Sequence, residues 1–183
     1  KELKVIADSK SKTYGEANPT LTFGYEGFVN DDNADDLTTK PDASTTLDAL
    51  TNAGVYTGAI TLAGGVANNY TFTYQAGNFT INPKELKVIA DSKSKTYGEA
   101  NPTLTFGYDG FVNDDNADDL TTKPAASTTV DALTNAGVYT GAITLAGGVA
   151  NNYTFTYQAG NFTVNAKELK VIADSKSKTY GEA

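Results

Sequence analysis

Acidic and amide side chains crowd one loop of the sequence, Asn30–Asp36, and calcium coordination is the chemistry that suits them best. Asp31, Asn33 and Asp35 alternate along the chain as the oxygen ligands of a calcium loop do. The same spacing returns later in the sequence, at Asp114, Asn116 and Asp118. These six side chains are therefore the candidate metal ligands.

The loop does not meet the requirements of an EF-hand. Asp36 stands where that loop needs glycine, and the twelfth position is Asp42 in one copy but Ala125 in the other. Two interpretations remain, a looser calcium site made of oxygen ligands and a solvated acidic loop that favours solubility. A melting temperature that is the same in excess calcium and in chelator would remove the first.

Aromatic residues suggest a second kind of site. If Tyr14, Tyr25 and Phe28 are exposed together, they form a patch suited to binding glycans. The alternative is that all three pack in the core or in turns, which is the commoner fate of aromatic side chains in a small β-domain.

Catalytic chemistry finds little support in the composition. The chain contains no His and no Cys, so the commonest general base and the thiol nucleophile are missing. Carboxylates are plentiful, but they crowd a polar loop, whereas acid–base catalysis needs one in a desolvated cleft. We therefore predict no catalytic residues and no enzymatic activity.

An internal repeat organises the whole chain. The sequence KELKVIADSKSKTYGEA begins at Lys1, at Lys84 and at Lys167. This spacing predicts two domains, 1–83 and 84–166, followed by the truncated start of a third unit, 167–183. We expect the chain to sample a longer array. The two full copies differ at five aligned positions, Glu26/Asp109, Asp42/Ala125, Leu47/Val130, Ile81/Val164 and Pro83/Ala166.

The pattern within each copy predicts strands. Short runs rich in Thr, Val, Tyr and Phe alternate in polarity and are separated by Gly, Asn, Asp and Pro. We expect strands near 2–8, 11–14, 21–25, 43–47, 55–62, 70–74 and 79–81, and one helical turn near 34–37. A turn is expected at 63–65, and a tight turn at 76–77 that makes 70–81 a β-hairpin.

These strands predict an all-β fold, with two tandem small antiparallel β-sandwiches, immunoglobulin-like or related, in an elongated array. The segment Asn52–Tyr56 resembles the tyrosine corner of immunoglobulin-like folds. Between the copies, Ile81-Asn82-Pro83-Lys84 passes almost directly from one strand to the next. Proline favours an extended backbone there, so we expect stiff end-to-end stacking of neighbouring repeats.

Charge and hydropathy restrict the partners. The net charge is −8, and all 14 basic residues are lysine, so binding to nucleic acid is not expected. No apolar run approaches the roughly 18 residues of a membrane-spanning helix, so we expect no membrane insertion by this segment. No cofactor is expected apart from the calcium considered above.

Several motifs taken together resemble a known family. They are the segments 12–19, 27–31, 53–56, 69–73 and 77–81, in the same order in both copies, and they resemble the MBG domain of the YGX type. The resemblance implies a tandem β-domain of large, repetitive, adhesin-like proteins of the bacterial cell surface. It implies an extracellular location and no catalytic residues.

Two functions follow from this resemblance. In the first, the repeats are a structural stalk or spacer that projects a functional region from the cell. Other regions of the same protein then bind surface glycans or proteins. In the second, each repeat is a weak glycan- or protein-binding module that acts through multivalency.

Overall fold

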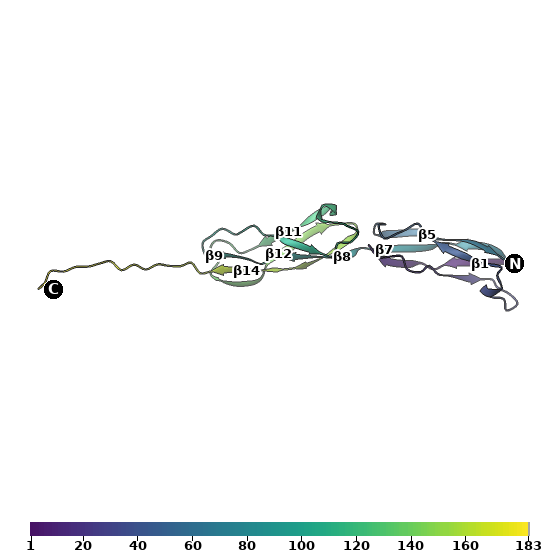
Figure 1. Cartoon of the computed structure of the whole chain (residues 1–183), viewed down its shortest axis with the longest axis horizontal. Coiled ribbons are helices and arrows are strands. Elements are labelled where there is room, and N and C mark those ends of the chain that lie inside the picture. The colour runs from purple at the N-terminus through teal and green to yellow at the C-terminus, as the bar shows by residue number, and fades with distance from the viewer. Residues whose placement is uncertain (183) are drawn as a thin grey trace.

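The structure is a computed structural model that describes residues 1–182. Two β-sandwiches lie end to end and form a rod, and Lys167–Glu182 continues beyond the second as an extended chain (Figure 1). We call residues 1–83 repeat 1, residues 84–166 repeat 2, and residues 167–182 the C-terminal segment. The all-β prediction is confirmed.

Each repeat contains seven strands and one short 3₁₀ turn. In repeat 1 they are β1 (Glu2–Ala7), β2 (Lys10–Thr13), β3 (Phe23–Glu26), η1 (Ala34–Asp36), β4 (Thr39–Ser44), β5 (Gly54–Val66), β6 (Thr71–Gln75) and β7 (Gly77–Asn82). In repeat 2 they are β8 (Lys84–Ala90), β9 (Lys93–Thr96), β10 (Phe106–Asp109), η2 (Ala117–Asp119), β11 (Thr122–Thr128), β12 (Gly137–Val149), β13 (Tyr153–Gln158) and β14 (Gly160–Asn165).

The start of each repeat is divided between the two sheets of its sandwich. In repeat 1 the strand order is β3-β1-β6 in one sheet and β2-β7-β5-β4 in the other, and repeat 2 has the same arrangement. β1 lies parallel to β6 and β2 lies parallel to β7, while the other pairs are antiparallel. The sheets are therefore mixed, because β1 and β2 run alongside strands from the end of the repeat.

The predicted hairpin over 70–81 is wrong. β6 pairs with β1 in one sheet, whereas β7 pairs with β5 and β2 in the other. Ala76 therefore carries the chain from one sheet to the other. Two strands of alternating polarity joined by a short Gly-containing segment can form a hairpin in one sheet or lie in the two different sheets of a sandwich. The local sequence is the same in both cases, so the pattern does not distinguish them.

The predicted turn at 63–65 is also wrong. Ala63, Gly64 and Gly65 lie inside β5, and Pro41 of the edge strand β4 faces Gly64. Gly64 and Gly65 have φ values of 77° and 86°, which lie in the left-handed region. Glycine thus distorts the strand locally without ending it.

Alternation of side chains builds the core between the sheets. In β1, Leu3, Val5 and Ala7 are buried, and in β7 Phe79 and Ile81 are buried. Tyr56 in β5 donates a hydrogen bond from its hydroxyl to the Asn52 carbonyl at 2.8 Å. This hydrogen bond confirms the predicted tyrosine corner and fixes the loop before β5.

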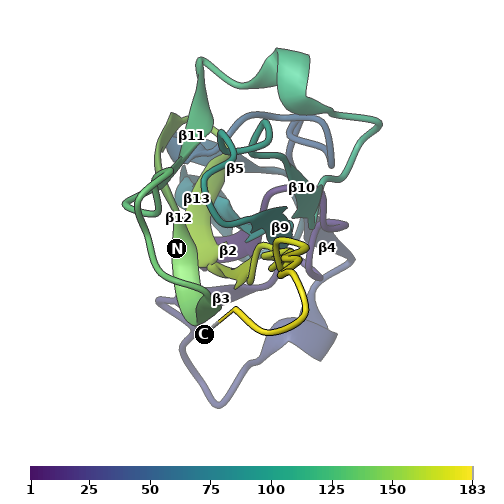
Figure 2. The same cartoon turned by 90° about the vertical axis from the view of Figure 1, so that its left-hand side faces the viewer.

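The two repeats differ in orientation about the rod. Viewed along the rod, the 3₁₀ turns η1 and η2 and their acidic loops project on opposite sides (Figure 2). Figure 1 shows the same arrangement from the side. Among residues 1–182, no helix has the length and apolar character needed to cross a membrane.

Candidate interaction site: the junction between the repeats

A single residue links the sheets of the two repeats. β7 ends at Asn82 and β8 begins at Lys84. The Asn82 carbonyl accepts a hydrogen bond from Tyr14 N within repeat 1 (2.9 Å), and Lys84 N donates to the Asn152 carbonyl within repeat 2 (2.8 Å). Only Pro83 separates these anchored groups, and its φ is fixed by its ring. The backbone therefore has little freedom to hinge here.

Identical residues with different exposure outline the surface buried at the junction. Tyr14 is 5% exposed, whereas its counterpart Tyr97 at the free end of repeat 2 is 40% exposed. On the facing side, Val112 is half-buried, but its counterpart Val29 is exposed. Because the sequences are the same, docking of the repeats accounts for the difference.

Two tyrosines meet on one carboxylate at the centre of the junction. Tyr153 donates a hydrogen bond to Asp115 Oδ2 at 2.7 Å, and Tyr14 from repeat 1 donates to the same oxygen at 3.1 Å. The two rings pack edge to face, with their centroids 5.7 Å apart. Hydrogen bonds from neutral hydroxyls to a carboxylate are stronger than those between neutral groups.

The surroundings of Tyr153 favour its neutral form. Burial raises the pKa of Tyr153, and its hydrogen bond to Asp115 and the charge of that carboxylate raise it further. The hydroxyl is thus held as a donor at neutral pH.

Asparagine side chains provide further polar contacts across the junction. Asn152 accepts from Ala53 N at 2.9 Å through its carbonyl and donates to Asn52 Oδ1 at 3.0 Å through its amide. Asn113 donates from its side chain to the Ala49 carbonyl at 2.9 Å. These hydrogen bonds give the junction a defined orientation as well as apolar contact.

Gly15 allows a close approach between the repeats. A Cβ atom built at Gly15 would lie 2.5 Å from Val112 Cγ2, whereas one built at the equivalent Gly98 meets nothing within 4 Å. Both glycines have left-handed backbone, with φ values of 85° and 84°. Glycine is thus required at position 15 for the turn and also for the contact.

The hydrophobic core is continuous through the junction. Leu86, Leu120 and Tyr153 of repeat 2 belong to the same buried cluster as Tyr14 and Phe79 of repeat 1. Their counterparts at the free outer end of repeat 1 form a small cluster of their own, made of Leu3, Leu37 and Tyr70. Docking therefore joins the end of one core to the start of the next.

A buried lysine holds the docking end of repeat 1 in shape. Lys12 donates from Nζ to the Glu16 carbonyl (3.0 Å), to Asn18 Oδ1 (2.9 Å) and to the Asp48 carbonyl (2.5 Å). These hydrogen bonds connect the turn after Tyr14 to the turn at 48–51. Burial lowers the pKa of Lys12, while Asp48 and Glu16 act in the opposite direction. Lys95 makes the equivalent contacts in repeat 2.

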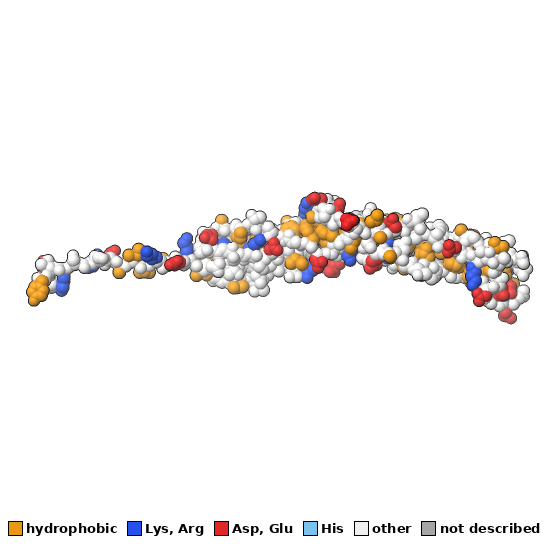
Figure 3. Space-filling view, viewed as in Figure 1, with side chains coloured by type: hydrophobic (Ala, Val, Ile, Leu, Met, Phe, Trp, Pro, Cys, Tyr) orange, Lys and Arg blue, Asp and Glu red, His pale blue; other side chains and the backbone are white. Residues whose placement is uncertain are grey.

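A polar cleft lies beside the junction. It has a volume of about 260 Å³ and is lined by Tyr14, Asn52, Asp115, Asp119, Thr121, Ala150, Asn151, Asn152 and Tyr153. An equivalent cleft of about 260 Å³ lies at the outer end of repeat 1, lined by Asp32, Asp36, Thr38, Ala67, Asn68, Asn69 and Tyr70. On the face in Figure 3, hydrophobic side chains gather near the middle of the rod, beside an acidic group.

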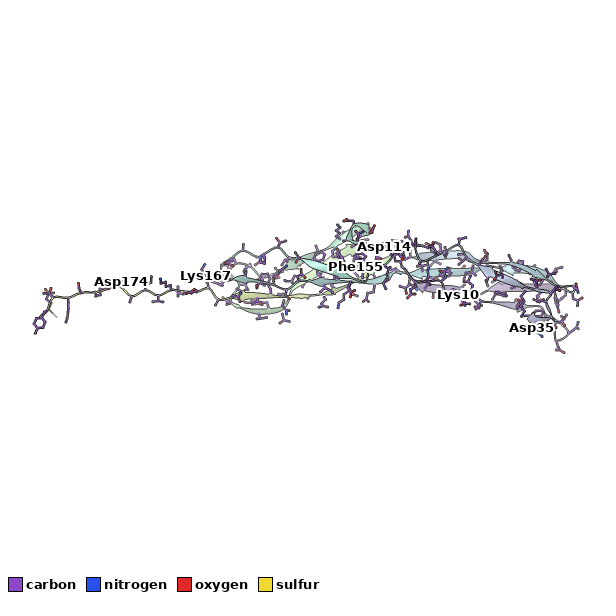
Figure 4. The ribbon with its side chains drawn as sticks, viewed as in Figure 1. Lys10, Asp35, Asp114, Phe155, Lys167 and Asp174 are labelled. Atoms are coloured by element: carbon purple, nitrogen blue, oxygen red, sulfur yellow. The ribbon has the colours of Figure 1, made fainter. Side chains whose placement is uncertain are left out.

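The structure gives the predicted calcium ligands other contacts. Asn33 caps η1 by accepting from Asp35 N at 2.9 Å, and Asp35 pairs with Lys40 at 2.6 Å, which lowers the pKa of Asp35. Asn116 and Asp118 do the same in repeat 2. Asp31 and its counterpart Asp114 have positive φ and are exposed. Figure 4 places Asp35 at the outer end of repeat 1 and Asp114 near the junction.

Within residues 1–182, no three Asp, Glu, His or Cys side chains form a group suited to a metal ion. Amide and backbone oxygens also bind calcium, so the calcium hypothesis stays a prediction.

The predicted aromatic patch is packed instead of exposed. Tyr14 is buried at the junction, and Tyr25 and Phe28 are half-buried, with ring centroids 5.3 Å apart. Phe28 also packs edge to face on Tyr70. The packing interpretation of these three residues is therefore correct.

The sequence did not reveal the residues that make the junction. Asp115 lies in the predicted acidic loop, but the alternating pattern selected its neighbours Asp114 and Asn116. Lys12 is one of several lysines in a polar segment, and nothing in the local pattern distinguishes it. Repetition of Tyr14-Gly15-Glu16 at 97–99 does not distinguish these residues either, because the two copies differ at only five positions.

Comparison with known families agrees with this arrangement. The MBG domain (YGX type) matches residues 3–80 and again residues 86–163. A comparison of the chain with curated proteins found no significant match. The two matches cover most of each sandwich, and Tyr14-Gly15-Glu16 fits the YGX of the family description. The chain belongs to the MBG domain family of the YGX type, which it contains as two tandem copies.

Proposed function

We propose that this chain is part of a structural stalk, a spacer that projects a functional region of a bacterial surface protein away from the cell. The observation that carries the proposal is the junction, where one residue connects two anchored strands and the cores of both repeats merge. A spacer transmits position only if its units resist bending, and such a junction supplies that resistance.

The family and the composition support the same role. MBG repeats suggest a large surface protein built from many units, which agrees with an extracellular location at the bacterial surface. The net charge of −8 keeps such an array soluble and disfavours association between neighbouring stalks. The role requires no catalytic residue and no cofactor.

Small-angle scattering of the 183-residue chain tests the proposal. The expected profile is that of an elongated particle whose cross-section is one sandwich wide. The matched control carries Gly-Gly-Ser inserted after Pro83, which leaves both sandwiches intact but separates their ends. This insertion should broaden the distribution of interatomic distances. A flexible or compact wild-type particle, indistinguishable from the insertion variant, would contradict the stalk role.

A further inference from the structure

The first and the last part of each repeat form two extended runs that lie side by side. In repeat 2 the first run is β8 followed by β9, and the last run is β13 followed by β14. β8 pairs in parallel with β13, starting with Lys84 opposite Tyr153. β9 pairs in parallel with β14, ending with Thr96 opposite Asn165. The two runs are therefore paired from one end of the sandwich to the other.

The chain enters and leaves repeat 2 at opposite ends of these runs. It enters at Lys84, where Pro83 connects β8 to repeat 1, and it leaves β14 after Asn165, at the far end of the sandwich (Figure 1). Tension along the rod therefore pulls the first run toward the junction and the last run away from it. This load acts along the strands and shears the runs past each other, so the evenly spaced hydrogen bonds of the parallel pairs bear it together.

Both runs change sheets at the same level, and the two crossings pack closely. The first run crosses at Asp91 and Ser92, and the last run crosses at Ala159. Gly160 is buried directly after its crossing, and a Cβ atom built there would lie 2.9 Å from the Asp91 carbonyl oxygen. Asn161 N donates to Ser92 Oγ at 3.0 Å. Sliding would bring a larger side chain to the place that glycine occupies, so the crossings oppose it.

Burial of alternate side chains on the two runs also resists a change of register. Leu86 and Val88 on β8 are fully buried, and Phe162 and Val164 on β14 are fully or almost fully buried. A slip by one residue would turn these side chains toward solvent. The runs can therefore slide only when the core of the repeat opens.

We propose that each repeat is a load-bearing clamp, which resists tension along the rod because its first run must be sheared from its last run. Repeat 1 has the same parallel pairs, β1 with β6 and β2 with β7, and the buried Gly77 at the same crossing. A stalk that is anchored at one end and held at the other experiences such tension, so the use of the clamp in the cell rests on the proposed function. The clamp itself does not, because it lies within each repeat, whereas stiffness against bending comes from the junction.

Single-molecule pulling with optical tweezers tests the clamp. The 183-residue chain is stretched by handles at its two ends, and each repeat should unfold in one abrupt step. Because the chain has no cysteine, handles can also be attached in reducing solution at Thr122→Cys and Val149→Cys, which lie opposite each other at the open end of the antiparallel pair β11 and β12. This load peels the edge strand β11 from its sheet, so repeat 2 should open at a severalfold lower force. Equal forces in the two directions would overturn the proposal.

A pair of glycine variants tests the crossing. Gly160→Ala places a Cβ against the opposite run, whereas a Cβ built at Gly107 on β10 meets nothing within 4 Å. Stretched by its ends, Gly160→Ala should unfold its two repeats at two different forces, with the unchanged repeat 1 as the internal reference. Gly107→Ala should unfold both at the wild-type force. Wild-type forces for both repeats of Gly160→Ala would overturn the proposal. If repeat 2 of this variant does not fold, the two pulling directions in the wild type decide.

An N-cap variant separates a weakened clamp from a general loss of stability. Asn116→Ala removes the side chain that accepts from Asp118 N at 2.9 Å at the start of η2, in a loop that belongs to neither run. It should lower the urea midpoint of repeat 2 and leave both unfolding forces unchanged. A loss of force as large as that in Gly160→Ala would show that force follows overall stability and not shear, and would overturn the proposal.

The Gly-Gly-Ser insertion after Pro83 distinguishes failure of the clamp from failure of the stalk. It separates the ends of the repeats but leaves the paired runs within each repeat intact. The insertion should therefore change the scattering profile, as the stalk role predicts, and leave both unfolding forces at the wild-type value. A lower force in the insertion variant would place the resistance to tension in the junction and would overturn the proposal.

Discussion

At the scale of single residues, the junction depends on a few side chains that each serve two purposes. Tyr153 and Asp115 close the end of their own repeat by a 2.7 Å hydrogen bond, and the same pair receives Tyr14 of the preceding repeat. At the free end of repeat 1, Tyr70 donates the equivalent hydrogen bond to Asp32 at 2.7 Å, although no tyrosine from a preceding repeat is bound there in the described structure. The receiving surface is thus formed before docking, which lowers the cost of ordering it.

Gly15 and Gly98 offer a prediction with a built-in control. Replacing either by alanine places a Cβ on left-handed backbone, at a cost of roughly 1 kcal/mol in the free energy of unfolding. Only in Gly15→Ala does that Cβ also collide with Val112. We expect Gly15→Ala to loosen the junction and Gly98→Ala to leave it intact, as measured by the scattering profile of each variant. Identical profiles would show that this contact does not hold the repeats together.

The tyrosines predict loss of stability in alkaline solution. Burial raises the folded-state pKa of Tyr153, Tyr25 and Tyr108 above the ordinary value of 10.0. A phenol with a raised folded-state pKa stabilises the fold fully below its unfolded pKa, and this stabilisation is lost as pH rises through the folded pKa. The free energy of unfolding, measured by urea titration, should therefore fall above about pH 10.

Tyr153→Phe provides the comparison for that pH dependence. Phenylalanine does not ionise, so the variant should lose less stability between pH 10 and 12 than the wild type does. Burial lowers the pKa of Lys12 below its ordinary value of 10.5, so Lys12 has the opposite effect on the pH dependence of stability, but it contributes equally to both proteins. Equal slopes in the two proteins would show that Tyr153 is not coupled to folding.

Residue-level prediction from the sequence was limited for a physical reason. The calcium pattern selected Asp31, Asn33 and Asp35 because they are close in sequence. Tyr14 and Asp115, which do meet, are 101 residues apart, and no local pattern connects them. A contact between two surfaces has no periodicity, and repetition does not indicate it either, because the two copies share nearly all of their residues.

At the scale of elements, the division of the first segment between two sheets determines the fold. β1 and β2 are joined by a bend at Asp8 and Ser9, and each runs parallel to a strand from the end of the repeat. The start and the end of a repeat are thereby held together. Alternation predicted most strands, but it could not say which strands pair, because pairing depends on how the two sheets face each other.

Lys12 ties β2 to the turn before β5, and its removal should be costly. Lys12→Ala leaves two carbonyl groups and the Asn18 side chain without their donor, so we expect a loss of about 1–3 kcal/mol in the free energy of unfolding. Lys4→Ala is the control, since Lys4 only makes a surface pair with Glu26 at 3.9 Å, worth less than about 1 kcal/mol. Chemical denaturation of both variants measures the difference, and equal losses would contradict a structural role for Lys12.

At the scale of the whole molecule, the repeats form a rod because each end surface fits the opposite end of the next unit. Such head-to-tail contacts do not close on themselves, so they extend in one direction. The short linker predicted stiff stacking from the sequence alone. The sequence did not show that the cores merge, since this depends on the length of the sandwich and on where its ends fall.

The most direct test of the account is the spread of distances between the two repeats. Thr61→Cys and Thr144→Cys place one spin label at an exposed position on β5 and one on β12, in a chain without other cysteines. Pulsed electron paramagnetic resonance then measures the distance distribution between them. A rigid junction predicts one narrow peak, which broadens when Gly-Gly-Ser is inserted after Pro83. A broad distribution in the wild type, unchanged by the insertion, would contradict the rod.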